Sequence, residues 1–283
     1  MIEEKSSEIE KRIGFIQGRL SELVNNRIQI FPVKNWKGEL KEASANGFGT
    51  LEWTIDSETI ADNPLISTEL IPKIIEHINN FHIRIPSVTC DYFMEKPPWL
   101  ESGRDLEDVL TKIMNGMGLL NSTKLVIPLV DNSSLSNIRY KTSVIDFFEK
   151  MNSIIVQNNI QICFESDFSP KNLAVFINEF PHYNYGINYD IGNSSSLGYL
   201  PQEEFEMYGN RIINVHVKDR VLHGKSVPLG EGSADFESVF KCLKAINYNG
   251  NYILQTARDA QGNHLSALLK YRSMVINWIN QYE

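Results

Sequence analysis

The sequence predicts an α/β fold, a (β/α)8 TIM barrel in a single domain. Short apolar segments rich in β-branched and aromatic residues alternate with longer segments of helical periodicity. Several of the short segments, such as 124–128, are apolar without clean alternation, which is typical of strands buried on both faces of a parallel sheet. Eight such units in 283 residues give roughly 35 residues per unit, close to the size of a ~250-residue barrel.

The eight expected strands are mostly bounded by Gly, Asn or Pro. They are Ile13–Gln17, Thr50–Thr54, Arg84–Val88, Lys124–Pro128, Ile160–Phe164, Tyr185–Tyr189, Ile212–His216 and Asn251–Leu254. Residues 1–12 are crowded with Glu, Lys and Ser, so we expect a frayed or helical lead-in and not a secretory signal, with the barrel in residues 13–283.

The expected helices lie between these strands and show a 3.6-residue apolar period. They are centred on Leu70–Ile78, Leu106–Met117, Val144–Ile155, Leu173–Glu179, Phe236–Ile246 and His264–Gln281, with weaker patterns near Trp36–Asn46 and Glu203–Tyr208. Asp235 is a suitable N-cap for the seventh helix. A doubly wound open sheet is the competing fold, but the segment after Gly14 lacks the glycine-rich turn GxGxxG that such folds place after their first strand.

The composition excludes several classes of function. Lys and Arg total 27 against 35 Asp and Glu, and a formal net charge of −8 is a poor match for a nucleic acid partner. The three cysteines, Cys90, Cys163 and Cys242, are far apart without CxxC spacing, which predicts reduced thiols in a cytoplasmic protein. No segment approaches the roughly 20 apolar residues of a membrane-spanning helix, so we expect no membrane partner.

Polar side chains stand at the ends of four consecutive predicted strands, where the loops of a barrel carry its chemistry. They are Glu165, Asp190, His216 and Gln255. Neighbouring strand ends lie about 5 Å apart, so these side chains can converge on one point. Two carboxylates, an imidazole and an amide oxygen favour Mn²⁺, Mg²⁺, Co²⁺ or Zn²⁺. Taken singly, each residue is more often a cap or a loop hydrogen-bonding group than a ligand.

Several motifs resemble one known family. The run Ile212–Arg220 followed by Val227–Phe236 closely resembles the sugar-phosphate isomerase/epimerase family, also called the xylose isomerase-like barrels. Tyr189–Asn193, Cys163–Glu165 and Gly47–Glu52 are similar to three further signatures of that family, in the right order. The similarity is nearest to the L-xylulose-5-phosphate 3-epimerase and hexulose-6-phosphate isomerase branch and covers almost the whole chain from Ile13.

The resemblance implies a divalent metal held by Glu165, Asp190, His216 and a fourth ligand from the last strand. It also implies proton transfer next to the carbonyl of a small sugar or sugar phosphate, with Glu165 as one acid/base. The sequence departs from the family pattern at the fourth position, where Gln255 replaces a glutamate. An amide oxygen can bind a metal, but it cannot take or give a proton near neutral pH, and the loss of a negative charge should weaken metal binding.

Gln255 therefore favours a one-base aldose–ketose isomerisation over a two-base epimerisation, unless another acid replaces the missing carboxylate. The candidate replacements are Asp219, Glu52, Asp91 and His223. A third possibility is a barrel that still binds a sugar but has lost the reaction.

Further residues are candidates for contact with the substrate. Arg19, Arg220 and Arg258 follow the first, seventh and eighth strands and are candidates to anchor a phosphate or carboxylate, the alternative being salt bridges at the rim. Lys218, Glu52 and Asp91 stand near other strand ends and are expected to orient the site or touch the substrate.

The same superfamily contains endonucleases that cut DNA at abasic sites. Those enzymes need more histidine ligands and a basic surface, whereas this chain has six histidines and a net negative charge. The sequence leaves open whether the barrel forms a homo-oligomer.

Overall fold

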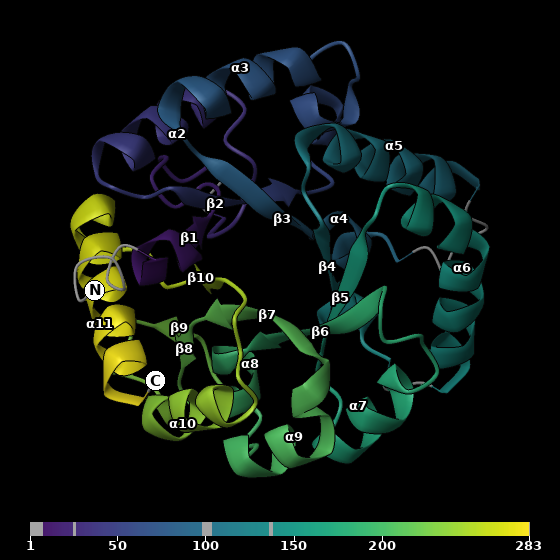
Figure 1. Cartoon of the computed structure of the whole chain (residues 1–283), viewed down its shortest axis with the longest axis vertical. Coiled ribbons are helices and arrows are strands. Elements are labelled where there is room, and N and C mark those ends of the chain that lie inside the picture. The colour runs from purple at the N-terminus through teal and green to yellow at the C-terminus, as the bar shows by residue number, and fades with distance from the viewer. Residues whose placement is uncertain (1–7, 25–26, 98–103, 136–137, 283) are drawn as a thin grey trace.

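The structure, a computed structural model, describes residues 8–24, 27–97, 104–135 and 138–282. Eight parallel strands close into a barrel in the order β1-β10-β7-β6-β5-β4-β3-β2, as Figure 1 shows, and the predicted fold is confirmed. These strands are β1 (Ile13–Ile16), β2 (Thr50–Ile55), β3 (Arg84–Cys90), β4 (Lys124–Leu129), β5 (Gln161–Ser166), β6 (Tyr185–Asp190), β7 (Ile212–Val217) and β10 (Tyr252–Leu254). Each matches a strand predicted from the sequence within one or two residues.

Helices form a ring outside the strands (Figure 1). They are α2 (Trp36–Ala45), α3 (Ile71–Phe81), α5 (Arg104–Leu120), α6 (Ile138–Gln157), α7 (Pro170–Ile177), α9 (Pro201–Tyr208), α10 (Phe236–Ala245) and α11 (His264–Tyr282). The two weaker helical patterns of the sequence correspond to α2 and α9, and Asp235 caps α10 by accepting a hydrogen bond from the Ser238 amide. No helix in the described part of the chain combines the length and apolar character needed to cross a membrane.

Residues 8–12 are helical, and residues 1–7 of the predicted lead-in lie outside the described ranges. Shorter elements complete the chain and were not predicted. They are α4 (Tyr92–Glu95), α8 (Ile191–Ser196), the hairpin strands β8 (Asp219–Arg220) and β9 (Ser226–Val227), and the 3-10 turns η1 (Ile60–Asp62), η2 (Pro64–Ile66), η3 (Asp131–Ser133) and η4 (Gly209–Arg211).

The barrel is held together by burial of strand side chains on both faces. Every residue of β2 and of β6 is buried, which explains why these strands lack a clean polar alternation. Aromatic rings join the helices to the strands: Phe148 of α6 packs edge-on against Phe164 of β5 with ring centroids 5.1 Å apart. Phe240 of α10 stacks on Tyr252 of β10 at 5.5 Å. Packing of this kind fixes the strand ends from which the candidate site is built.

Candidate functional site

Three side chains predicted to converge do so at the carboxyl ends of β5, β6 and β7. Glu165, Asp190 and His216 each offer one ligand atom, and these atoms lie within 4.8 Å of one another in a buried position. Parallel pairing of β6 with β7 sets Asp190 directly beside His216 in register. The three strands are neighbours in the barrel, so their ends bring the two carboxylates and the imidazole to one point.

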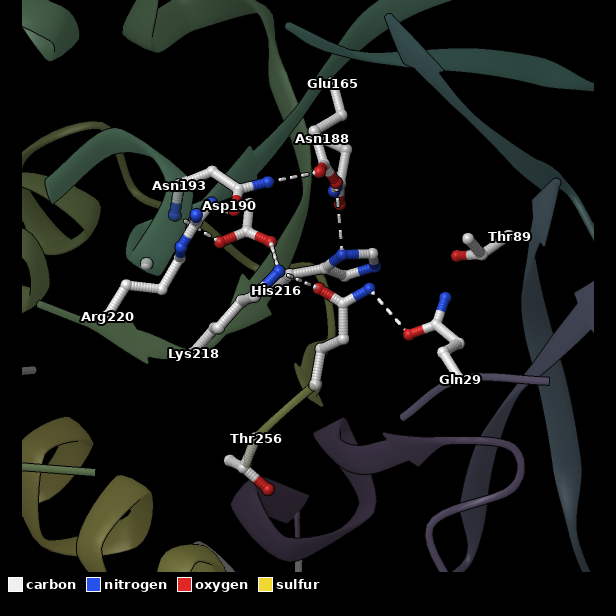
Figure 2. Close-up of polar contacts among 12 residues, drawn as sticks. Gln29, Thr89, Glu165, Asn188, Asp190, Asn193, His216, Lys218, Arg220 and Thr256 are labelled. Atoms are coloured by element: carbon white, nitrogen blue, oxygen red, sulfur yellow. Dashed lines mark hydrogen bonds and ion pairs between the residues drawn. The ribbon is translucent and has the colours of Figure 1, made fainter. Parts of the chain in front are cut away.

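The orientation of His216 is set by a carboxylate beneath it. Its Nε2 lies 2.7 Å from Glu52 Oε1, and both side chains are fully buried. The other ring nitrogen, Nδ1, forms an ion pair with Glu165 Oε2 at 3.3 Å (Figure 2). A histidine that binds a metal through one nitrogen usually bonds a carboxylate or carbonyl through the other. Nδ1, which faces Glu165 and Asp190, is therefore suited to be a metal ligand.

Glu52 is part of a buried polar network under the site and not part of its surface. It accepts hydrogen bonds from Ser87 and Thr89 of β3 and from Asn214 of β7. Burial alone would raise the pKa of Glu52, but the adjacent His216 and these donors hold it below its usual value. The expected contact of Glu52 with the substrate is not supported, because Glu52 does not line the cavity.

The charges of His216 and Glu52 stabilise one another. Burial by itself would lower the pKa of His216, but Glu52 and Glu165 outweigh that effect and raise it to about 10. Burial raises the pKa of Asp190, and the neighbouring Lys218 partly offsets this. In the metal-free protein the imidazole is therefore a cation held between two carboxylates.

Two asparagines hold Glu165, and neither was predicted. Asn193 Nδ2 donates to Glu165 Oε1 at 2.6 Å, and Asn188 Nδ2 donates to Oε2 at 2.7 Å (Figure 2). Asn188 precedes Asp190 by two positions on β6, so strand alternation places both on the same face and was a signal that would have found Asn188. Asn193 lies in the first turn of α8, where Asp190 is the N-cap and accepts a hydrogen bond from the Asn193 amide.

Gln255 joins a chain of side-chain hydrogen bonds across the mouth of the barrel. Lys218 Nζ lies 3.2 Å from Asp190 Oδ2 and 3.1 Å from Gln255 Oε1. Gln255 Nε2 then donates to Gln29 Oε1 at 3.0 Å, and Gln29 Nε2 donates to Asp91 Oδ2 at 2.6 Å. Figure 2 shows the ammonium of Lys218 beside Asp190 and the link onward to Gln29. The hydrogen bond to Gln29 needs an N–H donor at residue 255, and a glutamate carboxylate has none.

A cavity of about 450 Å³ opens over these residues. The site candidates from the sequence that line it are Glu165, Gln255, Asp91, Lys218 and Arg220. The other lining residues are Ile28, Gln29, Thr89, Met94, Pro128, Val130, Asp131, Asp167, Asn193, Ser196, Leu197 and His223. Its size suits a small molecule such as a monosaccharide.

Asp91 is the second buried carboxyl group in the cavity wall. Burial raises the pKa of Asp91 to about 7, the hydrogen bond from Gln29 opposes this rise, and the negative charge of Glu165 adds to it. A carboxyl group with such a pKa exchanges a proton readily near neutral pH.

Two predicted anion anchors point elsewhere. The Arg19 guanidinium donates to the backbone carbonyls of Thr256 and Ile28 at 3.0 and 2.7 Å. The Arg258 guanidinium donates to the carbonyls of Ile28 and Ser21 at 3.1 and 2.6 Å, and also to that of Gly18. Neither arginine lines the cavity, so their expected contact with a substrate is not supported. They tie the loop after β1 to the loop after β10.

Asp219 was expected to be catalytic, and its position argues against that role. Its Oδ2 accepts hydrogen bonds from the amides of Gly230 and Gly232 at 2.9 Å each, and its Oδ1 accepts one from Ala234 at 3.2 Å. It is fully buried and lies outside the cavity wall. A Cβ at Gly232 would lie 2.1 Å from Asp219 Oδ1, so the loop needs glycine there to wrap around the carboxylate.

Comparison with known proteins agrees with the barrel fold. The xylose isomerase-like TIM barrel family matches residues 40–273. L-ribulose-5-phosphate 3-epimerase UlaE of Salmonella paratyphi A is 37% identical over 87 residues, which are 30% of this chain and 31% of that enzyme. The chain thus aligns with less than a third of the length of this relative.

Solved structures share the fold over nearly their whole length. An IolI protein with a bound zinc atom has a TM-score of 0.72 at 14% identity, covering 96% of this chain and 99% of the other. A xylose isomerase-like TIM barrel protein from Mycobacterium smegmatis in complex with magnesium has a TM-score of 0.69 at 14% identity, covering 95% and 97%. With most of its length matched, this chain belongs to the xylose isomerase-like TIM barrel family.

Proposed function

We propose that this protein is a sugar isomerase or epimerase that moves a proton at the carbon next to a substrate carbonyl. Glu165 is the acid/base. The observation that carries the proposal is the buried meeting of Glu165, Asp190 and His216 beside a monosaccharide-sized cavity. The epimerase named among the curated relatives supports the same class of reaction.

A divalent metal fits these residues. Glu165, Asp190 and the Nδ1 of His216 that faces Glu165 offer three ligand atoms close together, and the amide oxygen of Gln255 is the proposed fourth. Mn²⁺, Mg²⁺, Co²⁺ and Zn²⁺ all accept such mixed oxygen and nitrogen donors. When bound, the ion supplies Lewis-acid polarisation of the substrate oxygens.

Protein side chains orient the acid/base and stabilise the charge that develops on the substrate. Asn188 and Asn193 hold both oxygens of Glu165, so its carboxylate keeps one direction while it takes and returns the proton. Lys218 brings a positive charge to the cavity wall, where negative charge develops on the oxygen of an ene-diol. Lys218 must leave Gln255 for that amide oxygen to bind the ion.

Gln255 cannot carry a proton, so a second acid/base would have to be another residue. Of the four replacements considered, only Asp91 and His223 line the cavity. Glu52 is held under His216, and Asp219 is enclosed by loop amides. A one-base isomerisation on Glu165 needs no replacement, whereas an epimerisation would use Asp91 or His223 as the second acid/base.

The test has two parts. The metal content of the purified protein is measured, and exchange of the substrate α-proton is followed by NMR in deuterated water over a panel of ketoses. We expect metal-dependent exchange in the wild type and at least a hundredfold slower exchange in Glu165→Gln, a loss typical of removing a general base. Binding of sugars without exchange, in the metal-loaded protein, would favour the alternative of a barrel that has lost the reaction.

A further inference from the structure

We propose that the substrate carries no phosphate and is an uncharged keto sugar. This inference rests on the proposed function and narrows its substrate class. It separates the chain from the similar L-ribulose-5-phosphate 3-epimerase, whose name includes a sugar phosphate. Two features of the site support it: the carboxylates of the cavity wall, and the internal hydrogen bonds of the groups that could bind a phosphate.

The cavity wall is acidic. Four carboxyl groups line it, those of Asp91, Asp131, Glu165 and Asp167. The basic side chains that line it are those of Lys218, Arg220 and His223. Asp131 and Asp167, which lie outside the proposed metal site, would repel a phosphate dianion, whereas sugar hydroxyls would donate hydrogen bonds to these carboxylates.

The two cationic groups of the wall are poorly placed for a phosphate. Lys218 Nζ lies beside Asp190 and Gln255, two of the proposed metal ligands, so after it leaves Gln255 it serves the oxygens next to the reacting carbon. Arg220 Nη1 donates to Asn193 Oδ1 at 2.8 Å, and its Nε and Nη2 both donate to the Gly224 carbonyl at 2.9 and 2.7 Å. The guanidinium therefore closes the β8–β9 hairpin and orients Asn193, and three of its five N–H groups are already used.

The loop amides that could bind a phosphate in such a barrel already donate hydrogen bonds within the protein. Phosphate sites in this fold usually form from the loops after the seventh and eighth strands and a nearby helix N-terminus. After β7, the Asp219 carboxylate occupies the amides of Gly230, Gly232 and Ala234. After β10, Asp259 Oδ2 accepts from the amides of Gln261 and Asn263 at 2.9 Å each, just before α11.

Arg19 and Arg258, the remaining arginines on these loops, point their guanidinium groups at backbone carbonyls. The arginines and loop amides named here after β1, β7 and β10 thus have internal partners. Binding a phosphate there would require breaking these contacts as well as overcoming the acidic wall.

The experiment compares each ketose with its own phosphate ester on the metal-loaded full chain. The probes are L-ribulose with L-ribulose 5-phosphate, and D-fructose with D-fructose 6-phosphate. Binding is measured by saturation-transfer NMR and calorimetry, and exchange of the α-proton by NMR in deuterated water. We expect the free ketose of a pair to be preferred by about tenfold or more.

The outcomes separate the two proposals. Equal or better binding and exchange of the phosphate ester would overturn the inference and leave the proposed function standing. If neither member of any pair binds or exchanges, both fail.

A charge-removal variant tests the cause. In Asp131→Asn/Asp167→Asn the ratio of phosphate-ester to free-ketose affinity should rise about tenfold, because two like charges leave the wall. Asn tolerates the positive φ of 52° at position 131. The matched control is Asp146→Asn/Glu149→Gln on the exposed face of α6, which removes the same charge elsewhere and should leave the ratio unchanged. An unchanged ratio in the cavity variant would refute exclusion of phosphate by these carboxylates.

Discussion

Glu52 acts on the site through the imidazole that it bonds. In Glu52→Gln the amide oxygen can still accept from His216 Nε2, but the negative charge that increases the basicity of the ring is lost. We expect metal affinity to fall about 10- to 100-fold. Titration calorimetry with Mn²⁺ on chelator-treated protein measures the effect, with the surface variant Glu149→Gln as control. An affinity equal to that of the wild type would mean that Glu52 does not tune His216.

Gln255 provides the opposite test, because here a charge is added. Gln255→Glu places a carboxylate where the amide oxygen now contacts Lys218, at the expense of the hydrogen bond to Gln29. A harder, charged ligand should raise Mn²⁺ affinity about tenfold or more. The same calorimetric titration detects it. A weaker or unchanged affinity would show that residue 255 does not reach the ion.

The raised pKa of His216 gives a pH dependence to the stability of the metal-free protein. The folded-state pKa of about 10 lies above the ordinary value of 6.5, so the charged ring stabilises the fold fully below about pH 6.5. That contribution is lost as the pH rises toward 10. We expect the difference in unfolding free energy between wild type and His216→Asn to shrink over this window, measured by urea unfolding with chelator present. A difference independent of pH would contradict the charged imidazole.

At the scale of elements, the loop after β7 depends on one carboxylate. Asp219→Ala removes a buried carboxylate that accepts from three part-buried loop amides and should destabilise the protein by about 2 to 4 kcal/mol in urea unfolding. Asp219→Asn keeps one acceptor oxygen and should cost less. If Asp219→Ala kept the stability of the wild type but lost proton exchange, Asp219 would be a catalytic residue after all.

Strand ends were predictable in a way that loop residues were not. Parallel pairing fixes the positions of Glu165, Asp190 and His216, so their places at the ends of neighbouring strands were enough to predict that they converge. One or two residues beyond a strand, the chain is free to turn. Asp219 turns into its own loop, and Arg258 turns toward backbone carbonyls. Those directions depend on contacts that no periodicity records.

For the whole molecule, the barrel was predictable because each strand and helix carries its own apolar pattern. The β8–β9 hairpin was not, since strands of two residues have no period to detect. Gln29 was also missed: it reaches the site from the loop after β1 and joins Gln255 and Asp91, which lie 226 and 62 residues away in sequence. Contacts between distant loops depend on the closed barrel as a whole.

Closure of the barrel rests on β1, which pairs with β10 on one side and β2 on the other. Gly14 stands at its centre, paired with Ile253, and a Cβ there would lie 2.6 Å from the backbone oxygen of Thr50. Backbone atoms of a paired strand cannot move aside cheaply, so Gly14→Ala should cost about 1 to 3 kcal/mol of unfolding free energy.

The matched control is Gly49→Ala, because a Cβ at Gly49 meets only the His82 carbonyl, at an ordinary 3.9 Å. Its unfolding free energy should stay within about 0.5 kcal/mol of the wild type. Urea unfolding of both variants measures the difference. Equal stability of the two variants would mean that the approach of β1 to β2 does not limit closure. A loss of unfolding free energy in Gly14→Ala alone would show that the pairing of β1 with β2 requires a residue without a side chain at position 14.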